Sequence, residues 1–270
     1  MKTRVISAVA LLPVLLIVLL ALPEIFTAIL VGLMSALAAY ELLYATGLVR
    51  NVRPVIYCSV AAFLVCLWCH LDMERAWAML GLVVLLTALF AEMMIDHVKF
   101  SFEKLAYCLM AALLIPLLFA SLIRIINGEY GRYVVCVPLI LAFIPDSGAY
   151  FAGRYFGKHK LAPVISPKKT VEGAIGGAAV AVLGMFLYAF IMDVAFSVEV
   201  SYTAALIYGV LGAGADVFGD LMFSSIKRQT GIKDYGNLIP GHGGILDRFD
   251  SMLMVGPLVE ILLILLPVVV

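Results

Sequence analysis

The segment from Ser224 to Asp250 concentrates the side chains of this sequence that could bind anions and cations. It holds three carboxylates, four basic side chains, one histidine and several glycines between two apolar stretches. Glycines allow backbone N–H groups to approach a phosphate closely, and carboxylates are ligands that hard cations such as Mg²⁺ prefer. The segment therefore predicts a site that handles phosphate groups and a metal ion.

A stripe of polar side chains leads into this segment. Asp216, Asp220 and Ser224 are spaced four residues apart, with Lys227 three residues further on, which places them on one face of a helix. A carboxylate that faces lipid costs about 2.5–3.5 kcal/mol on insertion scales, so the pattern indicates a hydrated cavity that contains a counterion. The alternative interpretation is structural pairing of these acids with Lys227 or Arg228.

Two carboxylates from separate segments suit Mg²⁺, and Asp220 with Asp247 is the pair that we predict. Mg²⁺ usually takes one or two protein carboxylates and completes its shell with water and phosphate oxygens. His242 could be a metal ligand, a proton shuttle or a phosphate donor. The segment has no second His or Cys to build a zinc site, which favours a hydrogen-bonding role in the loop.

A second polar cluster lies earlier in the chain. Asp146 follows an apolar run that a proline interrupts, and we expect it to point into the same cavity. Ser166-Pro167 predicts the N-cap and first position of a helix, with Lys168 and Lys169 in its first turn. Lysines there oppose the helix dipole, which becomes understandable if they and free backbone N–H groups bind phosphate together. Alternatively, they only follow the positive-inside rule.

Long apolar stretches must position these residues. The 270 residues are 64% hydrophobic and 13% charged, with a mean hydropathy of +1.12, against about 45–50% apolar and 25% charged usage in soluble domains. The apolar runs are continuous, so they predict helices rather than porin strands. We expect an all-α polytopic integral membrane protein with about nine spans of about 20 residues each, at Val5–Leu22, Ile25–Thr46, Val55–Leu71, Ala76–Ile95, Leu105–Ile126, Tyr133–Ala152, Val171–Met192, Tyr202–Phe223 and Ser251–Val270.

The basic residues predict the orientation of these spans. With a cytoplasmic N-terminus and nine crossings, the C-terminus lies outside, and every Lys and Arg except Arg75, Arg124 and Arg132 falls in an inside segment. The positive-inside rule disfavours the reverse arrangement. The charged loops of the second half therefore face the cytoplasm, where nucleotides are. The net charge of zero gives no argument for nucleic-acid binding.

The two halves of the chain differ in polarity. Residues 1–103 hold four spans with short connections, and their acids Glu41 and Glu92 lie near predicted helix ends, which indicates snorkelling or paired side chains rather than catalysis. Residues 104–270 hold five spans with longer loops rich in Gly, Lys and Asp. We predict an N-terminal scaffold or oligomer surface, followed by a catalytic membrane region with cytoplasmic loops.

Two segments resemble the phosphatidate cytidylyltransferases, the CDP-diacylglycerol synthases. Gly-Asp-Leu at 219–221, Ser-x-x-Arg-x-x-x-x-Lys-Asp at 225–234 and Pro-Gly-His-Gly-Gly-x-x-Asp-Arg-x-Asp at 240–250 are similar to the signature of that family. Pro-Asp-Ser-Gly-Ala-Tyr at 145–150 and Ile-Ser-Pro-Lys-Lys-Thr-x-Glu-Gly at 165–173 are similar to its other shared block. A polar signature of this length is far more specific than a lone glycine motif.

The resemblance implies transfer of CMP from CTP to phosphatidic acid, which yields CDP-diacylglycerol and pyrophosphate in phospholipid synthesis. It also implies a requirement for Mg²⁺, a second cation such as K⁺, a homodimer, and residence in a bacterial cytoplasmic (inner) membrane with the active site facing the cytoplasm. The attacking phosphate oxygen is already ionised near neutral pH, so in-line positioning and charge neutralisation can suffice without a strong base.

The resemblance also assigns expected roles to individual residues. Catalytic roles fall to Asp220, Asp247, Lys227 and Arg248, and cation ligation to Asp220, Asp247, Asp146, Asp250 and Ser224, with Asp216 supporting the helix face. The expected contacts to CTP and to the lipid phosphate come from Ser166, Lys168, Lys169, Lys227, Arg228, Lys233, His242, Gly243, Gly244 and Arg248.

Three other classes of membrane protein use similar residues. An ion-coupled transporter also places acids inside helices, but usually near the midplane at discontinuous helices in paired repeats. A CDP-alcohol phosphotransferase would carry an Asp-Gly-x-x-Ala-Arg block, which this sequence lacks. A polyprenol kinase would use CTP but transfer its terminal phosphate, so product analysis separates it from a synthase.

Overall fold

A computed structural model describes residues 13–238 and 243–269 of the chain. Packing divides the chain into two compact units. The first unit combines Met1–Asn127 with Lys227–Arg248, and the second combines Gly128–Ile226 with Phe249–Val270. The chain therefore leaves the first unit, builds most of the second, and returns to the first for a short polar segment.

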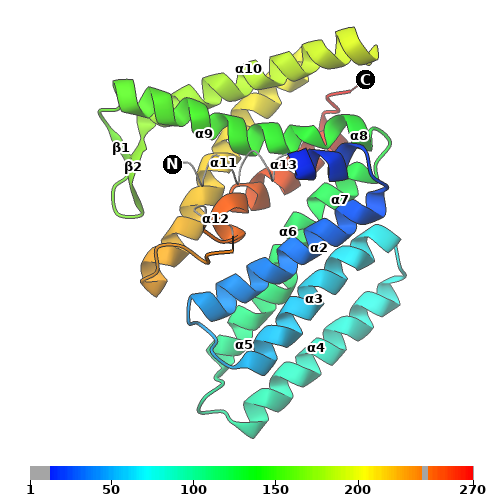
Figure 1. The fold of residues 1–270 in the computed structure, drawn as a ribbon, viewed down its shortest axis with the longest axis vertical. Helices are drawn as coiled ribbons and strands as arrows, with labels where there is room; N and C mark the ends of the chain where they lie inside the picture. Colours follow the sequence, from blue (N-terminus) through cyan, green and yellow to red (C-terminus); the bar gives the residue numbers. More distant parts are fainter. Residues whose placement is uncertain (1–12, 239–242, 270) are drawn as a thin grey trace. The chain divides into compact units, whose positions relative to one another are not determined.

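The first unit is built from antiparallel helices. Figure 1 shows α2 (Glu24–Tyr40), α3 (Val52–Leu71) and α4 (Arg75–Ile95) side by side. Helix α2 continues into a π-helical turn, η1 (Glu41–Ala45). The next span is made of consecutive pieces, namely α5 (Phe102–Leu109), the π-helical turn η2 (Met110–Leu114), α6 (Ile115–Phe119) and α7 (Ser121–Ile126).

The second unit contains the longest helices. Its elements are α8 (Gly131–Val134), α9 (Cys136–Phe156), strands β1 (Lys160–Ala162) and β2 (Ser166–Thr170), α10 (Val171–Phe196), α11 (Tyr202–Thr230) and α13 (Met252–Leu265). Helices α9 and α10 lie side by side in Figure 1, joined by the hairpin of β1 and β2. The last turn of α11 and most of the short helix α12 (Leu246–Phe249) belong to the first unit.

Seven helices in the described part of the chain are long and apolar enough to cross a membrane. They are Glu24–Ala45, Val52–Leu71, Arg75–Ile95, Phe102–Ile126, Gly131–Phe156, Val171–Phe196 and Tyr202–Thr230. Each overlaps one of the windows predicted from apolar length, so a helical polytopic membrane protein is confirmed. The window at Val5–Leu22 lies partly outside the described residues, although residues 13–20 are helical.

The ninth predicted span is shorter than expected. Helix α13 has 14 residues, or about 21 Å of helix against a hydrocarbon core of about 30 Å. Pro267 explains its end, because the residue before a proline is biased away from the α region. The remaining backbone turns back: the Ser201 N–H donates to the Val268 carbonyl at 2.9 Å, and Val200 pairs with Val269.

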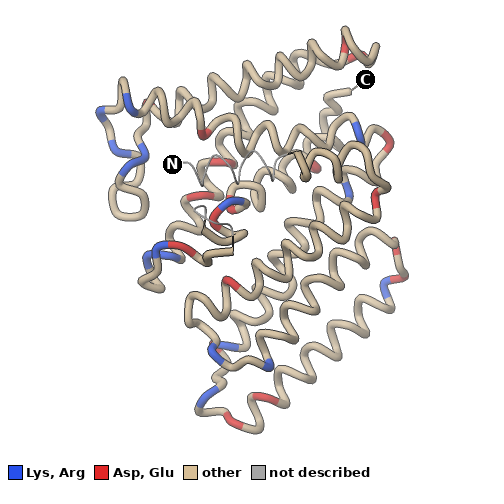
Figure 2. The backbone as a smooth tube through the Cα atoms, viewed as in Figure 1, with Lys and Arg blue, Asp and Glu red and all other residues tan. Residues whose placement is uncertain are grey.

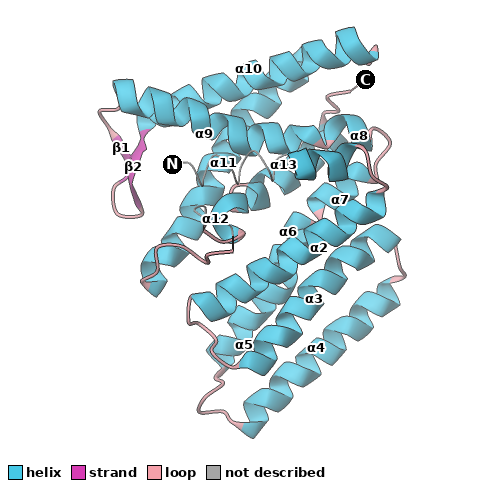
Figure 3. Cartoon of the chain, viewed as in Figure 1, coloured by secondary structure: helices cyan, strands magenta, loops and turns pink. Residues whose placement is uncertain are grey.

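The expected helix start at Ser166 is wrong. Figure 3 shows a two-stranded hairpin there, in which β1 pairs antiparallel with β2. The helix begins five residues later, at Val171, where the Thr170 hydroxyl accepts the Gly173 N–H at 3.1 Å as its N-cap. Pro167 suits a two-stranded ribbon as well as a first helical turn, because every strand there is an edge. The all-α expectation therefore needs this one correction.

Close packing of α9 against α10 gives the second unit its rigid core. A Cβ added at Gly148 would lie 2.7 Å from Val180 Cγ2, and one at Gly176 would collide with Ala152. Small residues at helix contacts allow close backbone approach, which is how membrane helices associate without a hydrophobic driving force between them. The glycines of this segment therefore allow close contact between α9, which carries Asp146, and α10, which follows the lysine hairpin.

Charged residues are distributed unevenly along each unit (Figure 2). In the first unit, Arg53 at the start of α3 lies 3.9 Å from Glu92 near the end of α4, while Arg75 begins α4 at the opposite end. In the second unit, basic residues gather on the last turn of α9 and on the hairpin, whereas Arg132 lies near the other end. The predicted division into a scaffold of residues 1–103 and a catalytic region of residues 104–270 was based on polarity and not on packing, and it stays a prediction.

Candidate functional site

A cavity of about 310 Å³ opens in the second unit, between α9, the hairpin, α10 and α11. Small side chains of α9 and α10 form part of its wall, and this is why it has room for a ligand despite the close helix packing. Ligand sites generally occupy about 300–1,000 Å³, with a few polar groups in a mainly apolar lining. Here the charged lining consists of Asp146 and Arg154 from α9, Lys168 and Lys169 from β2, and Asp216 from α11.

Asp216 is the most unusual member of this lining. Its side chain is 2% exposed, and among the described residues no hydrogen-bond partner is found for its Oδ1 atom. Burying a charged carboxylate without partners costs several kcal/mol unless a cation or proton compensates it. Since Asp216 also lines a cavity with Asp146, the arrangement fits a bound cation at this point.

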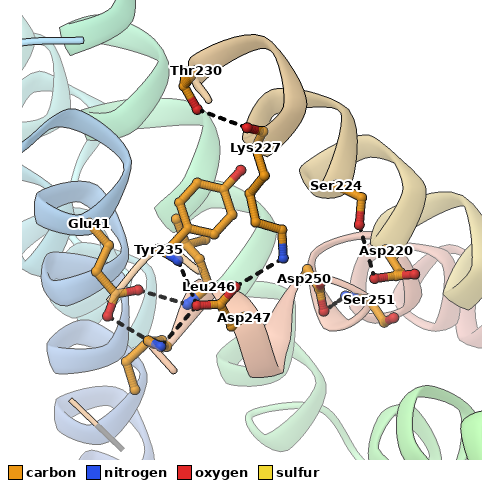
Figure 4. Close-up of polar contacts among 12 residues, drawn as sticks. Glu41, Asp220, Ser224, Lys227, Thr230, Tyr235, Leu246, Asp247, Asp250 and Ser251 are labelled. Carbon is orange, nitrogen blue, oxygen red and sulfur yellow. Dashed lines mark hydrogen bonds and ion pairs between the residues drawn. The ribbon is translucent and has the colours of Figure 1, made fainter. Parts of the chain in front are cut away.

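Asp220 lies one turn beyond Asp216 on α11 and is paired. Its Oδ2 atom forms an ion pair with Lys169 Nζ, with about a quarter of each side chain exposed. The Ser224 hydroxyl, a further turn along, points to Asp220 Oδ1 at 3.5 Å (Figure 4). The predicted stripe of Asp216, Asp220 and Ser224 is thus present on one helix face, and its cationic partner is a hairpin lysine rather than Lys227 or Arg228.

Asp250 lies under α11 rather than in the cavity lining. Its Oδ1 atom accepts the Ser251 N–H at 3.0 Å, and the Ser251 hydroxyl donates to the Asp216 carbonyl at 3.1 Å. A Cβ at Gly219 would lie 2.9 Å from the Asp250 carbonyl oxygen. The start of the last helix is therefore packed directly against the backbone that carries the two α11 acids.

Glu172 anchors the hairpin that presents the lysines. Its carboxylate accepts the backbone N–H groups of Lys158 and His159 at 3.1 and 3.2 Å, and it lies 2.6 Å from His159 Nδ1. The Val171 N–H in turn donates to the His159 carbonyl at 3.0 Å. The glutamate of the Lys-Lys-Thr-x-Glu-Gly block is therefore a structural clamp, a role that sequence reasoning left unassigned.

In the first unit, Asp247 is the centre of a second polar cluster (Figure 4). Its Oδ1 atom accepts from Lys227 Nζ at 2.9 Å, and its Oδ2 atom accepts the N–H groups of Tyr235 and Gly244 at 2.7 and 3.0 Å. The Asp247 side chain is only 3% exposed. A metal ion at Asp247 would have to displace Lys227 or these amides, so in this conformation Asp247 holds the loop together.

The basic residues of the signature differ in exposure. Lys227 is 12% exposed and lies 5.3 Å from the centroid of the Tyr235 ring, which is fully buried. Arg228, Lys233 and Arg248 are exposed. Gly243 has φ of +89°, which requires glycine, and His242 lies outside the described residues.

Glu41 also belongs to this cluster, although it is more than 200 residues away in sequence. It is 3% exposed, and its two carboxylate oxygens accept the N–H groups of Ile245 and Leu246, each at 2.9 Å. Of the two alternatives for this helix-end acid, snorkelling is therefore wrong, because Glu41 is buried and its partners are backbone amides. An acid inside an apolar span is a functional signal in itself, and that signal was available from the sequence.

The structure thus brings the predicted residues together in two groups. Asp146, Asp216, Lys168 and Lys169 line the cavity of the second unit, with Asp220 joined to it through Lys169. Lys227, Gly243, Gly244 and Asp247 form the cluster of the first unit. Ser166 is a strand residue paired with Ala162. Within residues 13–238 and 243–269, no three His, Cys, Asp or Glu side chains form a metal-binding group by themselves.

Comparisons with known proteins agree with the resemblance carried by the two polar blocks of the sequence. The sequence model described as the cytidylyltransferase family matches residues 2–266. The phosphatidate cytidylyltransferase of Staphylococcus haemolyticus (strain JCSC1435) is 39% identical over 166 residues, which is 62% of either chain. That of Staphylococcus epidermidis (strain ATCC 35984) is 38% identical over 184 residues, 68% of either chain, and that of Staphylococcus aureus (strain COL) is 39% identical over 166 residues, 62% of either chain.

The family model and the relatives match different shares of the chain. The alignment spans somewhat less than two thirds of the length of the first of these relatives, whereas the family model covers nearly the whole chain. Seven described helices are long and apolar enough to cross a membrane, and Asp146, Lys168 and Lys169 of the cavity and Lys227 and Asp247 of the second cluster lie in the segments that resemble the family. The chain therefore belongs to the cytidylyltransferase family.

Proposed function

We propose that this chain transfers CMP from CTP to phosphatidic acid, forming CDP-diacylglycerol and pyrophosphate. The family model and the curated relatives named phosphatidate cytidylyltransferase support this activity. The single structural observation that carries it is the cavity of the second unit, which combines a buried carboxylate oxygen without a hydrogen-bond partner among the described residues and a lining of Lys and Arg. A cation and phosphate oxygens together would satisfy both halves of that lining.

The reaction requires little proton transfer. A non-bridging oxygen of the phosphatidate headgroup attacks the α-phosphorus of CTP, and the bond from that phosphorus to the oxygen bridging to the β-phosphate breaks. Pyrophosphate leaves with the bonding electron pair, and the lipid oxygen becomes part of a new pyrophosphate link. Because both reacting groups are anionic, positioning and charge neutralisation are the contributions that the protein must make.

The cavity residues can supply these contributions. Two cavity residues present donors to phosphate oxygens: Lys168, which is exposed on β2, and Arg154, on the last turn of α9. Lys169 is held by its ion pair with Asp220, so its ammonium group is fixed at the cavity wall. Arginine suits bidentate phosphate contacts and lysine acts as a point charge, so these cations can offset part of the charge of a triphosphate.

Mg²⁺ fits the donors on this wall. Asp146 and Asp216 supply hard oxygen ligands in the cavity lining, and the buried Asp216 Oδ1 atom has no hydrogen-bond partner among the described residues. Mg²⁺ usually needs only one or two protein carboxylates because water and phosphate oxygens complete its shell. When bound, the ion would withdraw charge from the triphosphate. Asp146 and Asp216 would hold it, with Asp220 one helical turn away.

The proposal also includes substrate-binding roles for residues of the segment from Lys227 to Arg248, a second cation and a dimeric state. Roles of Asp247, Lys227, Arg228, Lys233, Arg248 and His242 in substrate binding remain predictions, as do a second cation such as K⁺ and a homodimer. Metal analysis of the purified protein and light scattering in detergent test the last two.

We further propose residence in a cytoplasmic (inner) membrane of bacterial type, with the hairpin facing the cytoplasm. In each unit by itself, basic residues gather at one helix end, which supports this orientation through the positive-inside rule.

Product analysis tests the proposed activity. Membranes containing the chain are incubated with phosphatidic acid and CTP labelled in the cytosine ring, and the lipids are extracted. The proposal predicts cytidine label in a lipid that co-migrates with CDP-diacylglycerol and depends on added phosphatidic acid. Lipid without label would contradict it. Ion-dependent solute flux in proteoliposomes without any labelled lipid would favour the transporter alternative instead.

A further inference from the structure

Glu41 is a buried acid to which the proposed chemistry assigns no role. It opens the π-helical turn η1 at the end of α2, where the change of helical pitch interrupts the regular backbone. Its carboxylate reaches Gly243–Arg248, accepting from the Ile245 and Leu246 N–H groups at 2.9 Å each (Figure 4). These are amides at the start of the short helix α12, where no intrahelical acceptor exists.

The space around the Glu41 carboxylate is closed by two glycines of the segment from Ser224 to Asp250, Gly236 and Gly244. A Cβ added at Gly244 would collide with both carboxylate oxygens, and one at Gly236 would lie 2.8 Å from Oε1. Gly244 has no positive φ, unlike Gly243. The reason for glycine at position 244 is therefore the approach of Glu41 and not the backbone conformation.

Asp247 holds the same segment from its other side. It accepts the Gly244 N–H, while Glu41 accepts the next two N–H groups along the chain. Three consecutive amides are thus fixed by two buried carboxylates, and Asp247 in turn fixes Lys227. Charge-assisted hydrogen bonds of this kind are roughly twice as strong as neutral ones, so the backbone of this segment has little freedom.

We infer that Glu41 is a positioning residue for the signature segment Gly243–Arg248. It does not touch substrate; it sets the backbone from which Asp247 projects, and Asp247 in turn holds Lys227 of α11. It does so from a helix in the part of the chain that carries no signature. The consequence for activity rests on the proposed function, whereas the consequence for the geometry of the loop does not.

A suppression experiment tests the inference without any substrate. In the wild-type background, Gly244→Ala forces its Cβ onto the Glu41 carboxylate, so the apparent unfolding midpoint in detergent should fall by about 5 °C. In a Glu41→Ala background the carboxylate is gone, and adding Gly244→Ala should lower the midpoint by less than about 1 °C. Equal effects of Gly244→Ala in both backgrounds would overturn the inference.

Gly243→Ala is the matched control. Its Cβ would lie 2.7 Å from Asp247 Oδ2, and its φ of +89° strains any side chain. Removing Glu41 relieves neither problem, so Glu41→Ala should not suppress Gly243→Ala. Suppression of both glycine variants would indicate a loop that has simply loosened, and it would also overturn the specific role of Glu41.

The conservative variant Glu41→Gln separates positioning from folding. Its amide can accept one N–H but directs an NH₂ group at the other, so hydrogen exchange should rise about tenfold in peptides covering 243–248 and stay unchanged in α3. If the chain is active, kcat per folded molecule should also fall about tenfold. Unchanged exchange would overturn the inference, whereas raised exchange in a protein without cytidylyltransferase activity would contradict only the proposed function.

Discussion

Asp216 is the residue on which the proposed chemistry most depends. Its buried Oδ1 atom and its place in the cavity wall distinguish it from Asp220, which is already paired with Lys169. A carboxylate in that state is stabilised by binding a cation and destabilised without one. The residue is therefore a better candidate for metal ligation than Asp220 and Asp247, the pair of carboxylates from separate segments that we predict from the sequence.

Asp216→Asn should raise the Mg²⁺ concentration for half-maximal rate about tenfold or more, because one ligand oxygen becomes an amide group. The unfolding midpoint should stay the same or rise, since asparagine has nearly the same shape as aspartate but buries no charge. Asp193→Asn, on an exposed turn near the end of α10, is the control and should change neither quantity. An unchanged Mg²⁺ titration in Asp216→Asn would remove Asp216 from the metal site.

The Lys169–Asp220 ion pair allows a charge-swap test. Lys169→Glu should raise the CTP concentration for half-maximal rate about tenfold or more, because a phosphate contact is replaced by repulsion. The double variant Lys169→Asp with Asp220→Lys restores opposite charges, so it should recover thermal stability but not CTP affinity. Recovery of both would mean that the pair is structural and that Lys169 does not bind phosphate.

At this scale, sequence reasoning identified the acids on α11 and the lysine pair, because charged residues in or beside apolar spans are conspicuous. It underestimated Asp216, since spacing shows a shared face but not which acid is buried. It also misjudged Glu41, whose partners Ile245 and Leu246 contribute only backbone N–H groups. Backbone donors are the same for every residue type, so no pattern of side chains could have revealed them.

The hairpin of β1 and β2 is the element that brings the lysines to the cavity. Its base is held by Glu172, which binds the Lys158 and His159 N–H groups and the His159 ring. The contact of Glu172 with the His159 ring contributes little by itself, because the histidine side chain is 78% exposed. The backbone N–H bonds are the part of this clamp that orders the loop.

Glu172→Ala should free the base of the hairpin. Hydrogen exchange in peptides covering 157–170 should rise about tenfold, since the Lys158 and His159 N–H groups lose their acceptor, and the CTP requirement should rise with it because Lys168 and Lys169 are no longer held. Glu199→Ala, an exposed acid between α10 and α11, provides the comparison. Exchange at 157–170 that matches wild type would show that β-pairing alone holds the hairpin.

Helix boundaries agree with the sequence prediction where the length of an apolar stretch determines them. They differ from the prediction at two prolines. Pro167 was assigned to a helix start but lies in a strand, because its fixed φ is compatible with both. Pro267 ends α13 early, although the apolar composition continues. In both places the local sequence is compatible with a helix and with an extended backbone. The extended form is seen where the backbone pairs with another segment: β2 with β1, and residues 268–269 with residues 200–201.

At the scale of the molecule, the proposal requires that the hairpin lie on the cytoplasmic side. Val164 at the hairpin tip is 86% exposed, and Glu129 lies in the exposed connection between α7 and α8, at the opposite end of α9. These positions are suited to labelling from the two sides of a membrane. The five native cysteines are free thiols and would first be replaced by alanine.

In that background, Val164→Cys should react with a membrane-impermeant maleimide in inside-out vesicles and stay unlabelled in right-side-out vesicles. Glu129→Cys should show the opposite pattern. The reverse result for both would invert the orientation that the basic residues predict. The helical membrane class followed from composition alone, but the two compact units did not, because the return of Lys227–Arg248 to the first unit is a long-range contact.

The fate of the three phosphates of CTP tests the central claim most directly. The purified protein in detergent, with phosphatidic acid and Mg²⁺, is given CTP labelled at either the α- or the γ-phosphate. A cytidylyltransferase should place the α-label in CDP-diacylglycerol and release the γ-label as pyrophosphate, in equal amounts. Transfer of the γ-label to lipid, or the absence of α-label from it, would contradict the account.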